Sequence, residues 1–195
     1  MRHLHFGKLF FVVFSLLLAC TVSARKPIKT LLITGQNNHN WQVSHVVLKQ
    51  ILENSGRFDV DFVISPEQGK DMSGFVLDFS PYQLVVLDYN GDSWPEETNR
   101  RFLEYVQNGG GVVIYHAADN AFSKWPEFNR ICALGGWEGR NENSGPYVYW
   151  KDGKLVKDSS AGPGGSHGRQ HEYVLNGRDK VHPVVKGLPL KWRHA

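Results

Sequence analysis

Three clusters of polar side chains carry the residue types in this sequence that are most able to do chemistry. Each cluster directly follows a short apolar run. An imidazole titrates near neutral pH and can exchange protons, while amides, carboxylates and an indole suit a polyhydroxylated ligand. Turn formation alone also favours Asn, Asp and Gly, but three such clusters favour a binding site for a small carbohydrate. The residues are Asn38, His39 and Trp41, then Asp88, Asn90 and Asp92, then His116 and Asp119.

A fourth polar cluster, His167, Arg169 and His171, lies in a glycine-rich segment. Two histidines four residues apart could bind a metal if they shared one face of a helix. Gly168 and the glycines before it argue against a helix. We therefore predict a loop that closes over the ligand, with Arg169 and His171 stabilising developing charge. The predicted acid/base residues are thus His116, His39 and His171, and no metal or cofactor is assigned.

Strands and helices that alternate along the chain must position these clusters. β-Branched apolar runs predict strands, and apolar residues at helical spacing predict helices. The predicted strands are 28–34, 58–64, 84–88 and 112–116, and the predicted helices are 43–54, 96–107 and 125–134. Residues 141–172 are predicted to be irregular, and one extra strand is predicted at 172–175.

This alternation predicts an α/β fold with a doubly wound, mostly parallel sheet. The carboxyl ends of parallel strands share one edge, and ligands bind there at the switch point of the strand order. We therefore expect His39, Asp88, His116 and His171 to converge in one cleft, with the other predicted sugar-binding residues around them.

Several other functions lack their sequence signatures. No dinucleotide fingerprint, phosphate loop or Gly-x-Ser-x-Gly elbow follows any predicted strand, and Ala117 stands where an elbow would place a nucleophile. The net charge is only +3 and no stripe of Lys and Arg occurs, so nucleic acid is not an expected partner.

The N-terminus has the pattern of an export signal. Arg2 and Lys8 are basic, and an apolar run over 9–19 is too short to span a bilayer. We predict a signal peptide over 1–24, with Cys20 as the lipidated residue in the alternative reading. The mature domain, 25–195, is then periplasmic or extracellular, and a lipid anchor at Cys20 would be its membrane attachment. Cys132 would have no intrachain disulfide partner.

Two segments resemble the signatures of the ThuA-like (trehalose-utilisation) family. The first is Gly109-Gly110-Gly111 with the strand that leads to His116-Ala117. The second begins at His167 and continues through His182-Pro183 to Pro189. The resemblance implies a flavodoxin-like fold of the class I glutamine amidotransferase-like superfamily without the amidotransferase cysteine. It also implies disaccharide utilisation in association with sugar oxidoreductases. Family members continue beyond Ala195, so we expect the domain to be incomplete at its C-terminus.

Three functional hypotheses follow. The first is an exported enzyme that acts on trehalose or a related disaccharide, including a 3-keto-sugar, by hydrolase- or isomerase-type acid–base chemistry. The second is a non-catalytic carbohydrate-binding module, and the third is a metal-dependent hydrolase that uses histidines.

Overall fold

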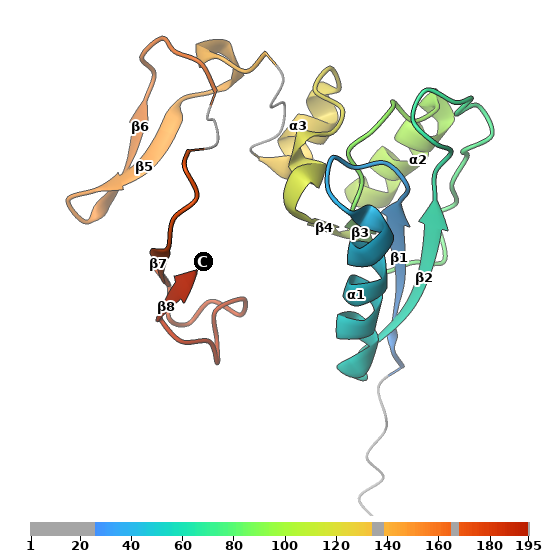
Figure 1. The fold of residues 1–195 in the computed structure, drawn as a ribbon, viewed down its shortest axis with the longest axis horizontal. Helices are drawn as coiled ribbons and strands as arrows, with labels where there is room; N and C mark the ends of the chain where they lie inside the picture. Colours follow the sequence, from blue (N-terminus) through green and yellow to red (C-terminus); the bar gives the residue numbers. More distant parts are fainter. Residues whose placement is uncertain (1–25, 134–138, 165–167, 195) are drawn as a thin grey trace, which may run out of the picture.

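A four-stranded parallel sheet forms the centre of the computed structural model, which describes residues 26–133, 139–164 and 168–194 (Figure 1). Its strands lie in the order β2-β1-β3-β4. Their β-branched runs suit a sheet that is covered on both faces. The predicted signal peptide and Cys20 lie outside the described residues. The strands are β1 (Ile28–Thr34), β2 (Phe58–Ile64), β3 (Leu84–Leu87) and β4 (Gly111–Ile114).

Helices cover the two faces of this sheet. Helix α1 (Trp41–Asn54) packs through Leu48 and Leu52 on the face that carries Leu32. Helices α2 (Glu96–Gln107) and α3 (Pro126–Cys132) cover the opposite face (Figure 1). The predicted doubly wound, flavodoxin-like α/β fold is therefore confirmed. No helix in the described parts of the chain has the length and apolarity needed to cross a bilayer.

The strand order creates a switch point at the centre of the sheet. Strand β1 pairs with β2 on one side and with β3 on the other, both in parallel. The connection through α1 runs to one side, and the later connection through α2 runs to the other. The carboxyl ends of β1 and β3 therefore lie at a switch point of the strand order, the position where open α/β sheets bind ligands.

The segment between β2 and β3 contributes to the core although it contains no strand. Phe75, Leu77 and Phe79 are buried, while Val76 and Asp78 between them are exposed. The three buried side chains join the cluster around Phe102 of α2. Sequence reasoning did not assign this segment, because Val76 interrupts the alternation of apolar and polar residues that marks a half-buried extended chain.

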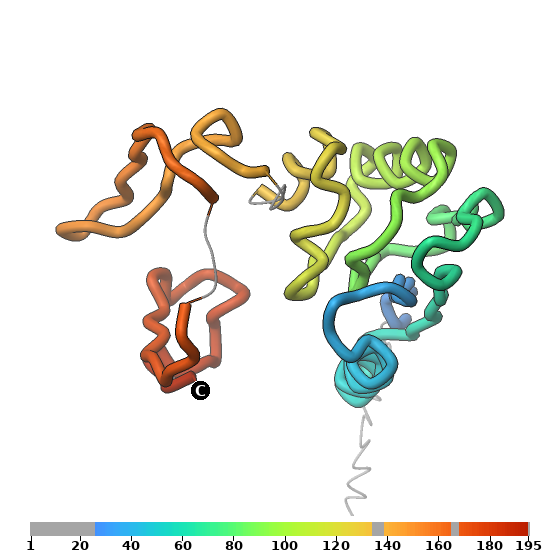
Figure 2. Tube along the Cα trace, turned by 45° about the horizontal axis from the view of Figure 1, so that its top comes forward, coloured from blue at the N-terminus to red at the C-terminus, as the bar shows by residue number. Residues whose placement is uncertain are grey.

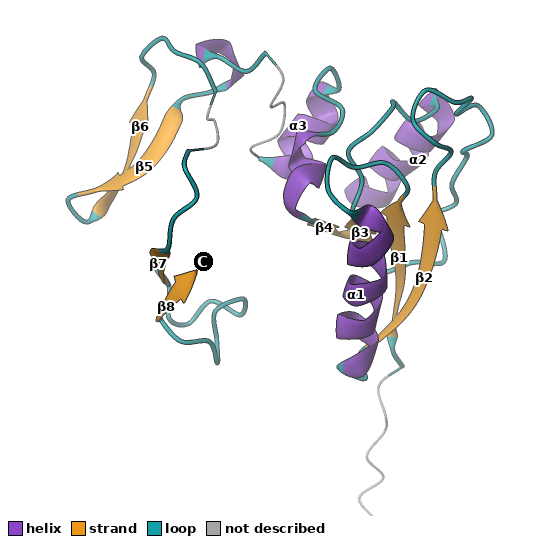
Figure 3. Cartoon of the chain, in the orientation of Figure 1, coloured by secondary structure: helices purple, strands orange, loops and turns teal. Residues whose placement is uncertain are grey.

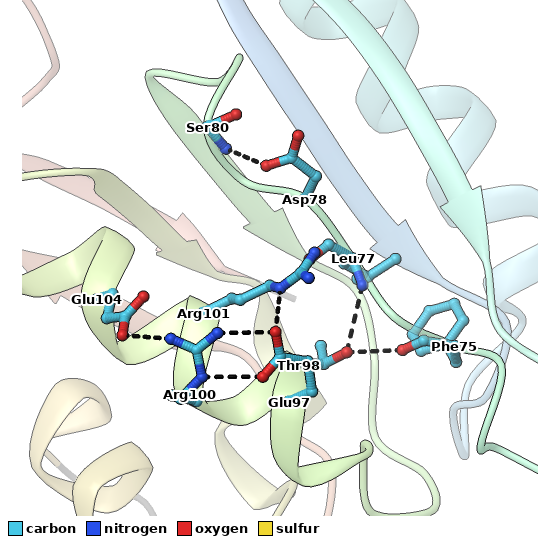
Figure 4. Close-up of polar contacts among 9 residues, drawn as sticks. All are labelled: Phe75, Leu77, Asp78, Ser80, Glu97, Thr98, Arg100, Arg101 and Glu104. Atoms are coloured by element: carbon cyan, nitrogen blue, oxygen red, sulfur yellow. Dashed lines mark hydrogen bonds and ion pairs between the residues drawn. The ribbon is translucent and has the colours of Figure 1, made fainter.

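Thr98 of α2 fastens this segment to the helix (Figure 4). Its hydroxyl donates to the carbonyl oxygen of Phe75 at 2.7 Å and accepts from the amide of Leu77 at 3.3 Å. Thr98→Val keeps the shape but leaves both buried backbone groups unpaired, so we expect it to lower the free energy of unfolding by about 1–3 kcal/mol. Urea denaturation measures this change.

Arg100→Gln, two residues further along α2, provides the control for Thr98→Val. Arg100 forms exposed ion pairs with Glu97 and Glu104 (Figure 4). Such exposed pairs contribute little, so we expect a much smaller change in the free energy of unfolding than for Thr98→Val. Equal effects of the two substitutions would show that Thr98 does not fasten the segment.

Two antiparallel hairpins follow the sheet in the chain and lie apart from it in both views (Figures 1 and 2). The first, after the short turn η2 (Glu142–Ser144), corrects the expectation of an irregular stretch over 141–172. Strand β7 confirms the extra strand expected at 172–175 to within a residue or two, but it pairs with β8 (Figure 3). The strands are β5 (Tyr147–Lys151), β6 (Lys154–Asp158), β7 (Tyr173–Asn176) and β8 (Lys191–His194).

Candidate functional site

Gln36 ties together the loops at the switch point. It is buried directly after β1, its carbonyl oxygen accepts from the amide of Asn90 at 2.8 Å, and its Oε1 accepts from the amide of Asp92 at 2.7 Å. Its Nε2 donates to the carbonyl oxygen of Pro66 at 2.8 Å. Gly91 permits this approach, because a Cβ there would lie 2.2 Å from Gln36 Oε1. Gln36 belongs to the polar stretch that follows the first predicted strand, but it was not among the predicted site residues.

Asp88 is the buried carboxylate of the site. Its Oδ2 accepts from the Ser44 hydroxyl at 2.5 Å and its Oδ1 accepts from Asn37 Nδ2 at 3.1 Å. Burial raises the pKa of Asp88, and the hydrogen bond from Ser44 opposes that rise. Asn37 in turn accepts from the amide of His39 at 3.0 Å. The carboxylate therefore holds the loop that presents His39, with Ser44 and Asn37 as partners that sequence reasoning did not single out.

His39 and His116 form the chemical centre of the site. Their Nε2 atoms are 3.0 Å apart and their ring centroids 4.5 Å apart. Both side chains are exposed, so a substrate can reach the two nitrogens. The contact requires that one ring donates Nε2–H to the lone pair of the other. The pair can therefore both give and accept a proton at one point in space.

Backbone strain supports a special role for His116. Strand β4 ends at Ile114, two residues before the predicted end, and His116 begins the short 3₁₀ helix η1 (His116–Asn120). Its φ is +48°, a left-handed conformation that is uncommon for residues other than glycine. Such conformations cost about 1–3 kcal/mol and concentrate at functional sites. The turn aims the imidazole at His39.

Four further predicted residues lie at the same edge of the sheet. Asn90 Nδ2 donates to Asn38 Oδ1 at 3.1 Å, which joins the loops after β3 and β1. Asp92 accepts through Oδ2 from the amide of Gly69 at 2.5 Å. Trp41, at the start of α1, is half-buried, with its ring centroid 5.9 Å from that of the buried His45.

The remaining predicted residues lie elsewhere. Asp119 lines a separate cavity of about 240 Å³ together with Arg140 and Tyr147. His171 contacts the carbonyl oxygen of Arg169 at 2.8 Å, just before β7, which lies apart from the sheet. The structure therefore does not bring His171 and Arg169 to the His39–His116 pair, contrary to the expected convergence. His167 lies outside the described residues.

Three observations bear on alternative sites. No three His, Cys, Asp or Glu side chains in the described ranges gather as ligands of a metal ion would. The thiol of Cys132 packs against the core, and burial raises its pKa to about 12, which makes it a poor nucleophile. A hollow of about 580 Å³ beside Tyr105 lies at the amino ends of the strands and contains none of the predicted site residues.

The raised pKa of Asp88 predicts a pH dependence of stability. An aspartate in the unfolded chain titrates near about pH 3.9. The native state therefore binds more protons above that pH, and the stability that a neutral Asp88 contributes is lost as pH rises through the higher native pKa. We expect Asp88→Asn to gain stability relative to wild type as pH rises from about 4 towards neutrality. Urea denaturation across this range measures the slope.

Asp71→Asn is the control of opposite sign for Asp88→Asn. The amide of Ser73, and then its hydroxyl, lower the pKa of Asp71. The stability that ionised Asp71 contributes is present above the unfolded pKa and is lost as pH falls through its native pKa. Asp71→Asn should therefore lose stability relative to wild type as pH rises in the acid range. Parallel slopes for the two variants would contradict the burial argument.

The fold and the position of these residues define the class of protein. The protein is a flavodoxin-like α/β protein with a polar site at its switch point. A family model described as ThuA, trehalose utilisation, matches residues 29–195. The chain therefore belongs to the ThuA family, which confirms the resemblance noted in the sequence.

Comparison with solved structures supports the fold. The chain is similar to a crystal structure from Bacteroides uniformis ATCC 8492 whose protein is described as ThuA-like, with a TM-score of 0.51 and 20% sequence identity. The similarity covers 87% of this chain and 59% of that one, so the chain spans less than two thirds of its neighbour's length. Comparison with curated proteins finds no match.

Proposed function

We propose that this protein transforms trehalose or a related disaccharide, including a 3-keto derivative, by acid–base chemistry at His39 and His116. Membership of a family described by trehalose utilisation supports the substrate class. The single observation that carries the chemistry is the 3.0 Å approach of the Nε2 atoms of two exposed histidines.

The two imidazoles have complementary roles in this proposal. When the substrate replaces the hydrogen bond between the rings, the ring that accepted this bond uses its Nε2 lone pair to take a proton. The proton comes from the attacking water in hydrolysis or from the carbon beside a keto group in isomerisation. The partner ring, protonated at Nε2, donates to the leaving or carbonyl oxygen. Asp88 is a positioning residue, because it acts on His39 through Asn37 and uses its oxygens for Ser44 and Asn37.

Export is part of the same proposal. The basic residues Arg2 and Lys8 before the apolar run at 9–19 support a signal peptide, with Cys20 as the alternative lipidation site. The substrate would then be met in the periplasm or outside the cell. Cell fractionation tests this, and uncleaved protein in the cytosol would contradict it.

Turnover and binding measured side by side test the proposed activity. The purified protein is incubated with trehalose and with its 3-keto derivative, with and without EDTA. Products are followed by NMR and affinity by calorimetry. We expect turnover of at least one of the two sugars that is insensitive to EDTA.

The other outcomes favour other functions. Binding without turnover would show a carbohydrate-binding module. Turnover that EDTA abolishes and Zn²⁺ restores would show a metal-dependent hydrolase.

A further inference from the structure

We propose that a second hollow at the carboxyl edge of the sheet binds the second pyranose ring of the disaccharide. It has a volume of about 560 Å³, within the range of small-molecule sites. This inference rests on the proposed function for its substrate class. The residues that carry the argument are Asn90, Asp92, Asn99, Asn120, Phe122 and Trp125.

The hollow is built from three elements that converge. Asn90 and Asp92 follow β3, Asn99 projects from the first turns of α2, and Asn120 ends η1. Aromatic residues of the connection between η1 and α3 complete the wall. The ring centroid of Phe122 lies 4.8 Å from that of Trp94 and 5.6 Å from that of Trp125, so this wall is held by the aromatic core.

The side chains match the chemistry of a sugar ring. Amides both donate and accept, so they can pair with neighbouring hydroxyls, while aromatic rings contact the apolar C–H face. Asn99 is the most informative member, because its Oδ1 is buried and has no hydrogen-bond partner in the described residues. Buried polar atoms are normally satisfied, so this acceptor would gain a partner if the Asn99 side chain turned its amide towards a ligand hydroxyl in the hollow.

The hollow and the candidate catalytic site are built on shared elements. Asn90 lines it and also hydrogen-bonds Asn38, the neighbour of His39. Helix η1 begins with His116 and ends with Asn120. At a rise of about 2 Å per residue, these two positions are about 8 Å apart along the helix. A disaccharide with one ring at the histidine pair can therefore place its other ring in the hollow.

Asn99→Leu tests the assignment, with binding measured by calorimetry on the full chain using trehalose and glucose as probes. The substitution removes an unpaired buried oxygen, so the fold should be as stable as wild type or more stable. We expect the Kd for trehalose to rise about tenfold, the effect of one lost hydrogen bond, and the Kd for glucose to rise less.

Asn108→Leu makes the same chemical change at the other, exposed end of α2 and should leave the Kd unchanged. Asn120→Ala, in η1, gives a second test and should also weaken trehalose binding. Equal trehalose affinity of wild type, Asn99→Leu and Asn120→Ala would overturn the proposal, as would the absence of any sugar binding.

The failure of this proposal can be told apart from failure of the proposed function. Wild-type turnover with unchanged affinity in the Asn99→Leu variant would overturn the second-ring site alone. Sugar binding that Asn99→Leu weakens, without turnover by wild type, would support the second-ring site and overturn the catalytic role of the histidine pair.

Discussion

His39→Gln and His116→Gln should each lower kcat/KM for the disaccharide by about 10²–10⁴-fold, the usual contribution of a general acid or base. Glutamine keeps a polar group of similar reach but cannot exchange a proton at neutral pH. Because the two rings meet at 3.0 Å and act as one unit, the double variant should be little slower than either single variant. Steady-state kinetics at pH 7 measure all three.

His194→Gln is the matched control for the histidine variants. His194 is exposed in β8, and its ring contacts Tyr173 within the second hairpin. This variant should turn over the disaccharide at the wild-type rate. Single effects that multiply in the double variant would show that His39 and His116 act independently, and near-wild-type rates for both would overturn the catalytic assignment.

The sheet and its two long helices follow from the sequence because their signals are local. The helix over Glu96–Gln107 has its predicted bounds, with Pro95 before it and acidic residues in the first turn. The first hairpin also had a local signal that the interpretation missed. Asp152 and Gly153 take φ values of +50° and +78°, the pattern of an Asp-Gly turn between two strands.

Pairing between distant segments is harder to predict than the strands themselves. Residues 173–176 form a strand close to the expected place, but nothing local specifies whether it joins the parallel sheet or pairs with Lys191–His194. Val174 and Trp192 are both exposed, so burial did not select the register there. This pairing closes the long loop between the two strands, and closing a long loop has an entropic cost. The contacts that offset this cost cannot be predicted from the sequence pattern of one strand.

The rule for parallel sheets correctly placed His39, Asp88 and His116 at one edge, because strand ends share it whatever the loop details. The rule could not predict which of the three side chains are exposed and which is buried. Asp88 points into the protein towards Ser44, whereas the two imidazoles face outward. That difference arises from the left-handed turn at His116 and from the hydrogen bonds of Asn37, which depend on the folded loops.

Phe102→Ala should lower the free energy of unfolding by about 3–5 kcal/mol, a large share of the 5–15 kcal/mol typical of a domain. Phe102 is fully buried at the centre of the aromatic core, with ring centroids of Phe79 and Trp94 at 5.5 and 5.8 Å. Truncation removes apolar burial and leaves a cavity that rigid aromatic neighbours cannot fill by small shifts. Urea and thermal denaturation measure the loss.

Phe62→Ala makes the same change on the edge strand β2, where the side chain is 47% exposed. About half of its surface is already in water, so we expect a loss of only about 1 kcal/mol.

The aromatic cluster around Phe102 also supports Phe122 and Trp125, the wall of the proposed second-ring site. Phe102→Ala should therefore weaken trehalose binding at temperatures where the domain is still folded, whereas Phe62→Ala should not. Equal losses of stability in the two variants would contradict the placement of the core on the α2 face of the sheet.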